Sequence, residues 1–442
     1  MIMNMKRIRS KSEHIRFYSL FFVMTVVLFI RYAFQVEVPR VVFTILIALI
    51  ALAGTQDEIV AICMCCIPLH ESVDFFHAVV ICTAAYVLKF HRKIRINLGA
   101  LLVLTMIFWE LLHCFDSTFS IMGFLVSVIP LIVLAVMLCT DVSELDYVFI
   151  VRAVAITTAI LCVVLLTKLI IQADFNVVIA INGLRRLGLV SDENQRSALI
   201  GEAINPNTLG ILCVLAITTL MQLRTIGRHA TVDVLLMIVL LIFGTLTSSR
   251  TYLVCLALMI VLLLMGQRGN RKQRSRFLFS LLILLLLAIV ILNRFFPTLM
   301  KYYIARFSED DITTGRMDLM RVYNEYILDN PDVMFFGVGL HNFGIKLTEI
   351  YRVANNAPHN GIQEIIIAWG IPGSILFVLL LAMMIRLSKK YSDRHVLLNY
   401  IPLLVILTKS MAGQLLTSPY TMLSLSFAYL SLAQVFKLRE KT

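Results

Sequence analysis

Charged side chains are scarce in this sequence. Asp, Glu, Lys and Arg make up 15% of its 442 residues, whereas they make up about 25% of an average soluble domain. Hydrophobic residues make up 60%, and they occur in long runs that short basic clusters separate. The shortage of charge and the length of the apolar runs exclude an ordinary water-soluble domain and predict a polytopic membrane protein.

The features of a disulfide framework or a metal centre are also missing. The nine cysteines lie in or beside apolar segments, where a thiol behaves as a small hydrophobic side chain. None lies in the long polar segments 172–205 and 294–360. The run Cys63, Cys65 and Cys66 has no His or Cys partner at the spacing of a metal site. We therefore predict no bound metal and no cofactor.

Two further absences concern processing and transport. The basic start of the chain leads into an apolar stretch without a small-residue cleavage site. This favours a retained first helix over a removed signal peptide. No internal repeat of the kind found in many secondary transporters is visible.

The apolar runs predict an all-α transmembrane bundle with a long, partly helical extracytoplasmic loop. A helix needs about 20 residues to cross ~30 Å of hydrocarbon, and most runs approach this length with their flanking residues. The bundle has about 14 spans, or about 12 if residues 41–88 hold a re-entrant pair. The strong runs are 17–34, 98–112, 119–138, 147–171, 234–246, 252–265, 277–292, 362–385 and 422–435, and the weaker ones are 41–53, 59–68, 75–88, 208–223 and 396–407.

The placement of Lys and Arg predicts the orientation. Short loops rich in these residues stay cytoplasmic, and an even number of spans separates every pair of basic clusters, so both termini are predicted to be cytoplasmic. The formal charge of +12, from 39 Lys and Arg against 27 Asp and Glu, then follows from topology and attraction to anionic lipid. We expect no nucleic-acid partner. The clusters lie at 6–16, 92–95, 224–228, 268–276, 386–394 and 437–441.

The polar segments 172–205 and 294–360 then lie outside, and their length is typical of loops with a function. In the second loop, Thr313 and Thr314 can cap a helix that begins near Arg316. This helix should end near Asp329, because Pro331 disfavours helical geometry in the residue before it. We expect the helix to lie on the membrane surface over the bundle.

Six short motifs follow one another on the predicted outward face. They are Asn205-Pro206-Asn207, Ser248-Ser249-Arg250-Thr251, Thr314-Gly315-Arg316, Gly337-Val338-Gly339, Pro358-His359-Asn360 and Trp369-Gly370-Ile371-Pro372-Gly373. Their order and sidedness resemble the O-antigen ligase and O-antigen polymerase superfamily of integral-membrane glycosyltransferases. We accordingly divide the chain into N-terminal transmembrane helices, 1–171, and a ligase/polymerase-like membrane domain, 172–442, which includes both outer loops.

The resemblance implies metal-independent transfer of a glycan from an undecaprenyl-diphosphate carrier to a sugar hydroxyl outside the cytoplasmic membrane. His359 suits the general base, since a histidine pKa near ~6.5 leaves the ring neutral at working pH. Arg250 and Arg316 suit the diphosphate, because a guanidinium binds phosphate oxygens in a forked geometry. These three are the predicted catalytic residues. The predicted substrate-binding residues are Arg185, Arg186, Asn207 and Asn360.

Each of these residues also has a structural interpretation. His359 and Asn360 could form a helix N-cap after a proline, and Asn207 could do the same. Arg250 could anchor its span at the lipid headgroups, and Arg316 could be a surface charge on an interfacial helix.

Four other polar residues are predicted to be structural. His341 is expected to be a solvated loop residue. Glu110 and His113 lie one turn apart near the outer end of a span, where they could face each other or line the cavity. Lys409, near the end of a late span, is treated in the same way, although intramembrane charges often mark functional sites.

The resemblance leaves the acceptor open. We favour a repeat-unit polymerase for O-antigen, capsule or exopolysaccharide, whose acceptor is another lipid-linked glycan. A ligase that transfers the glycan to lipid A-core or another acceptor is the alternative, and a transporter or flippase of lipid-linked sugars is an alternative of a different class. The expected partners are the donor, the acceptor and the bilayer, together with a chain-length regulator and a flippase of the same pathway.

Overall fold

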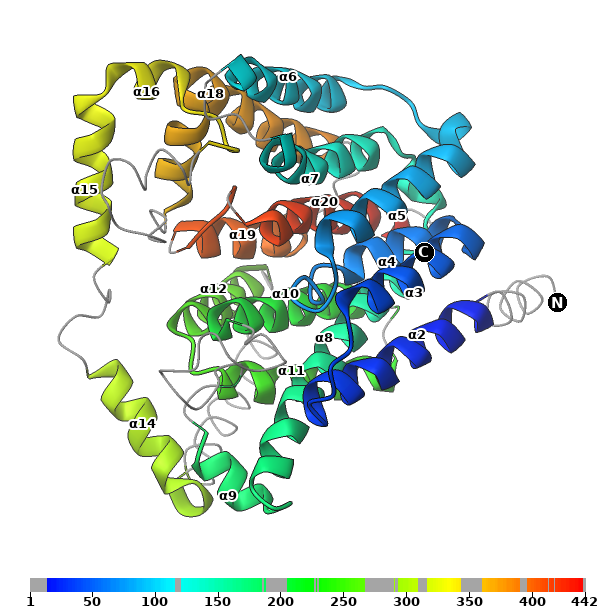
Figure 1. Cartoon of the computed structure of the whole chain (residues 1–442), viewed down its shortest axis with the longest axis vertical. Coiled ribbons are helices and arrows are strands. Elements are labelled where there is room, and N and C mark those ends of the chain that lie inside the picture. Colours follow the sequence, from blue (N-terminus) through cyan, green and yellow to red (C-terminus); the bar gives the residue numbers. More distant parts are fainter. Residues whose placement is uncertain are drawn as a thin grey trace.

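A computed structural model describes residues 14–115, 121–184, 187, 205–225, 228, 230–266, 290, 293–308, 316–342, 360–389, 396–411, 413–416 and 418–439. Helices form the regular elements of this part of the chain (Figure 1), and Ile94 and Thr140 add one isolated β-bridge. The prediction of an all-α fold is confirmed. The elements are α2 Ile15–Leu28, η1 Phe29–Ala33, α3 Arg40–Ala53, α4 Gln56–Cys65, α5 Phe75–Phe90, η2 His91–Lys93, α6 Leu98–Leu112, η3 His113–Phe115, α7 Ile121–Cys139, η4 Val142–Glu144, α8 Tyr147–Gln172, α9 Val177–Asn182, α10 Pro206–Thr225, α11 Thr231–Leu246, α12 Arg250–Gly266, α14 Pro297–Phe307, α15 Arg316–Asp329, α16 Pro331–Phe336, α18 Gly361–Lys389, α19 Val396–Met411 and α20 Pro419–Arg439.

Several helices have the length and composition of membrane spans, which confirms a polytopic membrane bundle. The predicted span 277–292 lies almost wholly outside the described residues. The long apolar helices are Ile15–Ala33, Ile121–Cys139, Tyr147–Gln172, Pro206–Leu223 and Gly361–Leu387, and the shorter ones are Arg40–Ala53, Leu98–Leu112, Thr231–Leu246 and Arg250–Met265.

Helix α4 is too short to cross a membrane by itself. Its 10 residues extend about 15 Å, half of a ~30 Å hydrocarbon layer. Thr55 and Glu58 form a capping box at its start, where the Thr55 N–H donates to Glu58 Oε2 at 2.8 Å. After α4 the chain continues through turns in which Ile67 and Leu69 are fully buried. In the segment 41–88, α4 is therefore a half-length helix between α3 and α5, and it packs against α5 and α8.

Helix α10 occupies the centre of the C-terminal half, where it packs against α8, α11, α12 and α19. Most of its apolar side chains are buried, and 89% of its span Pro206–Leu223 is inside the bundle. Helix α20 lies between α7 and α19 and packs against both (Figure 1). These helices form the scaffold on which the outer segments rest.

Paired charges stabilise the end of the bundle that carries the basic clusters. Arg152 of α8 forms a two-pronged ion pair with the buried Asp233 of α11, with N–O distances of 2.7 and 2.8 Å. Asp233 also accepts a hydrogen bond from the Ala230 N–H at 2.6 Å and so caps α11. Lys89 donates to the Leu52 carbonyl at 2.6 Å, which satisfies a free acceptor at the end of α3.

Candidate functional site

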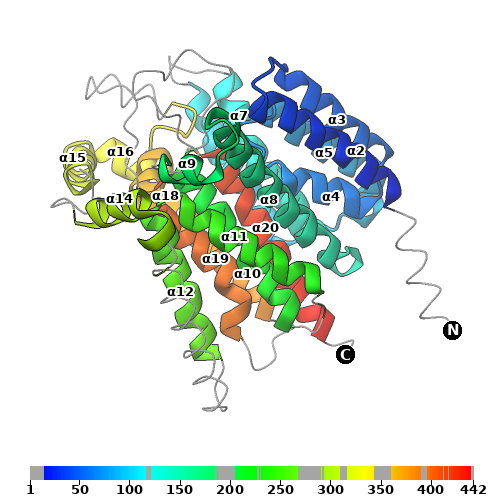
Figure 2. The ribbon, with the colours of Figure 1, turned by 90° about the horizontal axis from the view of Figure 1, so that it is seen from below.

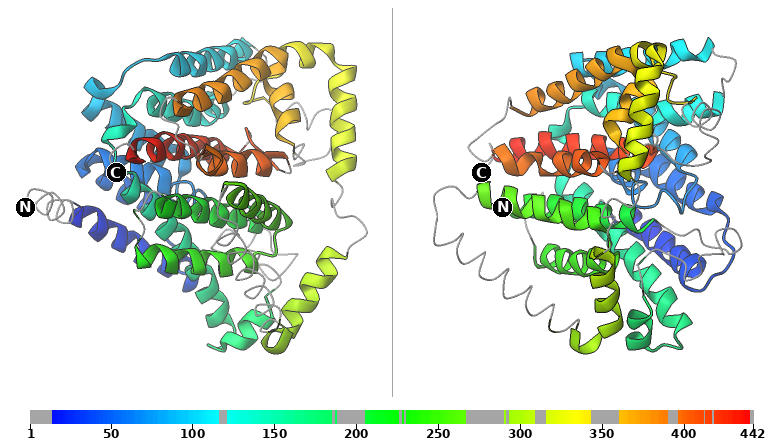
Figure 3. Two further views of the ribbon diagram at one scale, coloured as in Figure 1. Left: turned by 180° about the vertical axis from the view of Figure 1, so that it is seen from behind. Right: turned by 90° about the vertical axis from the view of Figure 1, so that its left-hand side faces the viewer.

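One end of the bundle gathers the starts of four helices and the loop helices. Helices α10, α12, α18 and α20 begin at this end, and α11 and α19 finish there. Figure 2 shows α14, α15 and α16 along one side of the bundle, opposite the ends of α12 and α20. In Figure 3, α14 and α15 stand across the bundle ends. This end carries the described residues of the predicted site, and it is called the loop end below.

Arg250 is the first residue of α12 and is half-buried. The preceding turn is tight, with Ser248 at φ 50°. Ser249 Oγ donates to Asn207 Oδ1 at 3.0 Å, so the start of α10 is fixed beside the start of α12. The Asn207 N–H in turn donates to Asn205 Oδ1 at 2.9 Å. Two of the predicted site residues, Arg250 and Asn207, therefore share one neighbourhood.

The first outer loop returns to the same turn. The Leu187 N–H donates to the Leu246 carbonyl at 2.9 Å, and the Leu187 side chain is fully buried. This contact lies one residue after Arg186. Both Arg185 and Arg186 lie outside the described residues, so their predicted role in substrate binding stays a prediction.

Helix α15 begins at Arg316 and ends at Asp329, as the threonines and Pro331 predict. Tyr323 and Ile327 are buried, so one face of α15 packs against the protein. The backbone of Arg316 starts the helix, but its side chain is not among the parts that the structure describes.

The start of α18 is bound to α15 through two amide side chains. Buried Asn360 caps α18 by accepting from the Ile362 N–H at 2.9 Å. Gln363 Nε2 donates to the Met320 carbonyl and to Asn324 Oδ1, each at 2.7 Å. Capping thus accounts for the conformation of Asn360, and the start of α18 lies beside the middle of α15. His359 is the preceding residue and lies outside the described residues.

Glu364 fixes the loop between α19 and α20 to α18. Its buried carboxylate accepts from the Leu415 N–H at 2.5 Å and from the Leu416 N–H at 2.9 Å. Sequence reasoning missed this residue. A carboxylate in the first turn of an apolar helix is costly to bury without donors. The position of Glu364 in the sequence could therefore have indicated that other groups donate hydrogen bonds to it.

The Gly337-Val338-Gly339 motif docks on an interruption of α18. Gly370 has a φ of 64°, and Pro372 has no N–H to donate to the Ala368 carbonyl. The Gly339 N–H donates to Ala368 instead, and the Val338 N–H donates to Ile367, both at 2.8 Å. Two family-like motifs, far apart in the sequence, therefore complete each other's backbone hydrogen bonding.

Glu110 joins this region to α6. Its fully buried carboxylate accepts from the Leu340 N–H at 2.9 Å, the His341 N–H at 3.0 Å and Trp369 Nε1 at 2.8 Å. His341 Nδ1 lies 2.5 Å from Glu110 Oε1. The expectation of a solvated His341 is wrong, because the glycine turn carries this histidine inward to the carboxylate. His113 faces Phe336 rather than Glu110, and its Nε2 lies 3.0 Å from the Phe336 carbonyl.

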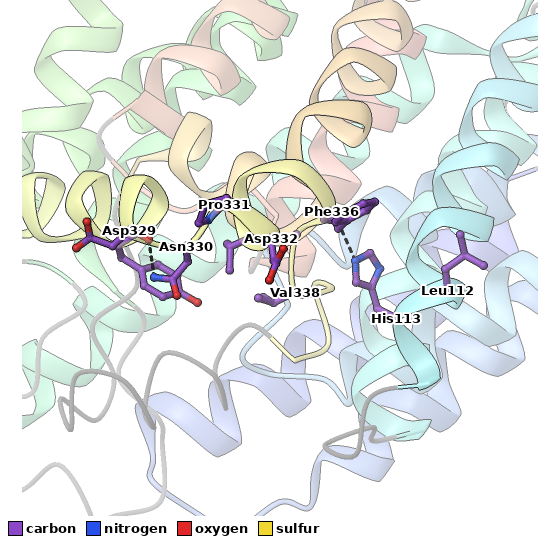
Figure 4. A pocket seen from close by; sticks show the side chains of 11 residues that line it. Leu112, His113, Asp329, Asn330, Pro331, Asp332, Phe336 and Val338 are labelled. Carbon is purple, nitrogen blue, oxygen red and sulfur yellow. Dashed lines mark hydrogen bonds between the residues drawn. The ribbon is translucent and has the colours of Figure 1, made fainter.

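A pocket of about 660 Å³ opens between α15, α16 and the end of α6 (Figure 4). Asp329, Asp332 and His113 give it a polar wall. Arg250, Asn207 and Asn360 are the predicted site residues whose side chains the structure describes, and they lie outside this pocket. Within the described residues, no group of three or more His, Cys, Asp or Glu side chains has the arrangement of a metal site.

The described helices define a multi-pass α-helical membrane protein with polar motifs gathered at one end. Residues 235–378 match the family model described as O-Antigen ligase, which confirms the resemblance to the O-antigen ligase and polymerase superfamily and indicates a glycosyltransferase-type membrane enzyme. The match includes Arg250, Arg316, His359 and Asn360, whereas Arg185, Arg186 and Asn207 precede it. No curated protein matches the chain.

Proposed function

We propose that this protein transfers a glycan from an undecaprenyl-diphosphate carrier to a sugar hydroxyl at the extracytoplasmic face of the cytoplasmic membrane. The match of residues 235–378 to the O-antigen ligase family carries the proposal. The geometry supports it, because the matched motifs at Arg250, Gly337-Val338-Gly339 and Asn360 all lie at the loop end of the bundle.

The proposed reaction needs two groups. His359 accepts the proton of the acceptor hydroxyl as the oxygen attacks the anomeric carbon, and the bond from that carbon to the diphosphate oxygen breaks. Arg250 and Arg316 hold the diphosphate that leaves with the electron pair. Arg185, Arg186, Asn207 and Asn360 are proposed to contact the donor or the acceptor. No step calls for a metal ion.

The acceptor is proposed to be a second lipid-linked repeat unit, which makes the protein a polymerase of a surface polysaccharide such as O-antigen, capsule or exopolysaccharide. The matching family, O-Antigen ligase, favours a ligase as the second candidate, with lipid A-core or another molecule as acceptor. Both candidates use the same donor chemistry.

The test is the glycan profile of cells that lack the native protein and carry either the wild-type chain or His359→Ala at equal levels. We expect the variant to lose transfer by about 10²- to 10⁴-fold, the usual contribution of a general base. His77→Ala is the matched control, because His77 is an exposed histidine at the start of α5, and it should preserve the wild-type profile.

The form of the loss separates the candidates. Single repeat units that still reach their normal acceptor would identify a polymerase, whereas polymer that accumulates on the lipid carrier would identify a ligase. A wild-type profile from His359→Ala would contradict the catalytic assignment and favour a transporter of lipid-linked sugars.

A further inference from the structure

Lys409 is a buried cation at the loop end of the bundle. It lies in the last turn of α19, and only 8% of its surface is exposed. Its ammonium group donates to the Gln414 carbonyl and, at 2.8 Å, to Thr421 Oγ1. It also lies 5.3 Å from the centre of the Tyr420 ring. All three partners are neutral.

The described residues provide no carboxylate within ion-pair distance of Lys409. Two acidic side chains at this end have other partners. Glu364 accepts from the Leu415 and Leu416 N–H groups. Glu71 pairs with His70 at 3.4 Å, and the hydrogen bond from His70 lowers the pKa of Glu71.

Burial makes this charge costly. An ammonium group removed from water loses several kcal/mol of hydration unless an anion or a full set of acceptors replaces it. The end of α19 offers only a partial negative charge of about one half, and the start of α20 beside Thr421 offers a partial positive charge. One of the three N–H donors of the ammonium group has no partner among the described residues. The position therefore suits a cation whose counter-ion arrives with a ligand.

Helix register places Lys409 level with Arg250. Helices α12 and α19 pack against each other and run in opposite directions, and the Cys255 thiol donates to the Val405 carbonyl at 3.8 Å. Lys409 lies four residues beyond Val405, and Arg250 lies five residues before Cys255. Both positions are thus about 6 to 8 Å further toward the loop end, at 1.5 Å per residue.

Side-chain hydrogen bonds connect the two cations through the start of α10. The Tyr420 hydroxyl lies 2.8 Å from Thr208 Oγ1. Asn207, the neighbour of Thr208, accepts from Ser249 Oγ at 3.0 Å, and Ser249 precedes Arg250. A continuous band of polar side chains therefore runs from Lys409 to Arg250 across the start of α10.

We infer that Lys409 binds a phosphate group of a lipid-linked diphosphate and forms, with Arg250, the cationic wall that holds it. This inference rests on the proposed function, since it assigns the donor headgroup to a defined place. A diphosphate offers several oxygens that can accept from the ammonium group, and it supplies the negative charge that the described protein does not provide beside Lys409.

The test compares wild-type, Lys409→Met and Lys301→Met protein, purified as full-length chains in lipid nanodiscs. Undecaprenyl diphosphate is titrated into each, and inorganic pyrophosphate and phosphatidylglycerol serve as separate probes. Lys301 is the control because it is an exposed lysine on α14. We expect Lys409→Met to weaken undecaprenyl diphosphate binding by about 10- to 100-fold, as expected for loss of a hydrogen bond to a charged group, and Lys301→Met to leave it unchanged.

A stability measurement separates binding from folding. Without ligand, Lys409→Met should melt at or above the wild-type temperature, because methionine removes a buried charge that lacks an anionic partner. Its shift in melting temperature with undecaprenyl diphosphate should be smaller than that of the wild type. Lys409→Arg keeps the charge and should retain more affinity than Lys409→Met.

Three outcomes would overturn the inference. Equal diphosphate binding by wild-type and Lys409→Met protein would overturn it and leave the proposed function standing. Loss of phosphatidylglycerol binding alone would assign the cation to bilayer headgroups instead. Failure of the wild-type chain to bind the diphosphate would overturn the proposed function together with the inference.

Discussion

At the residue scale, Glu110 links the N-terminal half of the chain to the motifs of the loop end. Its carboxylate accepts from two backbone N–H groups and the Trp369 indole, and it lies against the His341 ring. All these groups are buried. Removal of the carboxylate would leave each of these donors without an acceptor. A buried donor without an acceptor costs about 1–3 kcal/mol.

Glu110→Ala should therefore reduce the free energy of unfolding by about 3–5 kcal/mol, because several buried donors lose their acceptor at once. Glu110→Gln keeps one acceptor oxygen and should cost less. Thermal unfolding of the purified protein in detergent measures both effects. The control is Glu144→Gln, because Glu144 and Lys93 form an exposed ion pair at 2.6 Å that should contribute less than about 1 kcal/mol. Equal melting temperatures for Glu110→Ala and the wild type would contradict this role.

At the element scale, the interrupted helix α18 provides the seat for the segment 337–339. The interruption leaves the Ile367 and Ala368 carbonyl groups without a donor from within the helix. The glycine segment approaches closely enough to donate backbone hydrogen bonds to both. A Cβ at Gly337 would lie 2.4 Å from the Ala368 carbonyl oxygen, and Gly337 has a φ of 79°. Both the space and the backbone conformation thus require glycine at this position.

Gly337→Ala should reduce the free energy of unfolding by about 2–4 kcal/mol, which combines the strain of a positive φ with the loss of a buried hydrogen bond. It should also reduce glycan transfer, since the segment is one of the matched motifs at the loop end. Gly183→Ala is the control, because Gly183 is exposed and its φ of −76° suits any residue. Melting curves and glycan profiles of the two variants provide the comparison, and similar curves would show that the close approach is unimportant.

Sequence patterns predict the elements better than they predict their contacts. The apolar runs indicate α7, α8 and α18, because crossing a membrane demands a local property of the chain. The end of α15 at Asp329 follows from Pro331. The pairing of Glu110 with His341 joins residues 231 positions apart, and no local pattern encodes it. His341 looks solvated because it lies beside Asn342 in the long polar segment 294–360. The glycine turn that carries it inward is seen only in the structure.

At the scale of the whole molecule, the loop end and the basic end of the bundle are predicted to face opposite sides of the membrane. The paired charges at Arg152 and Asp233 lie at one end, and Arg250, Asn207 and Asn360 lie at the other. Single cysteines test this arrangement. Among the native cysteines, only Cys114 is not buried, so the Cys114→Ser protein should show little labelling by a thiol reagent.

In that background, Lys301→Cys on α14 should react with a membrane-impermeant maleimide in intact spheroplasts. Arg92→Cys, also exposed, should react only after the membrane is opened, because its basic segment is predicted to be cytoplasmic. The parent Cys114→Ser protein measures background labelling. The reverse pattern would contradict the predicted orientation and would move the site to the cytoplasmic face.

The network around Glu110 also constrains the order of biosynthesis. Ribosomes complete α6 long before the donors exist, since Leu340 follows Glu110 by 230 residues and Trp369 follows it by 259. During that interval the carboxylate must remain hydrated or protonated at the end of α6, because burying it alone is costly. A nascent chain can therefore insert its first helices early, but it can close this junction only after α18 has left the translocon. The packing of α6 is thus finished only when residues 340–369 have been made.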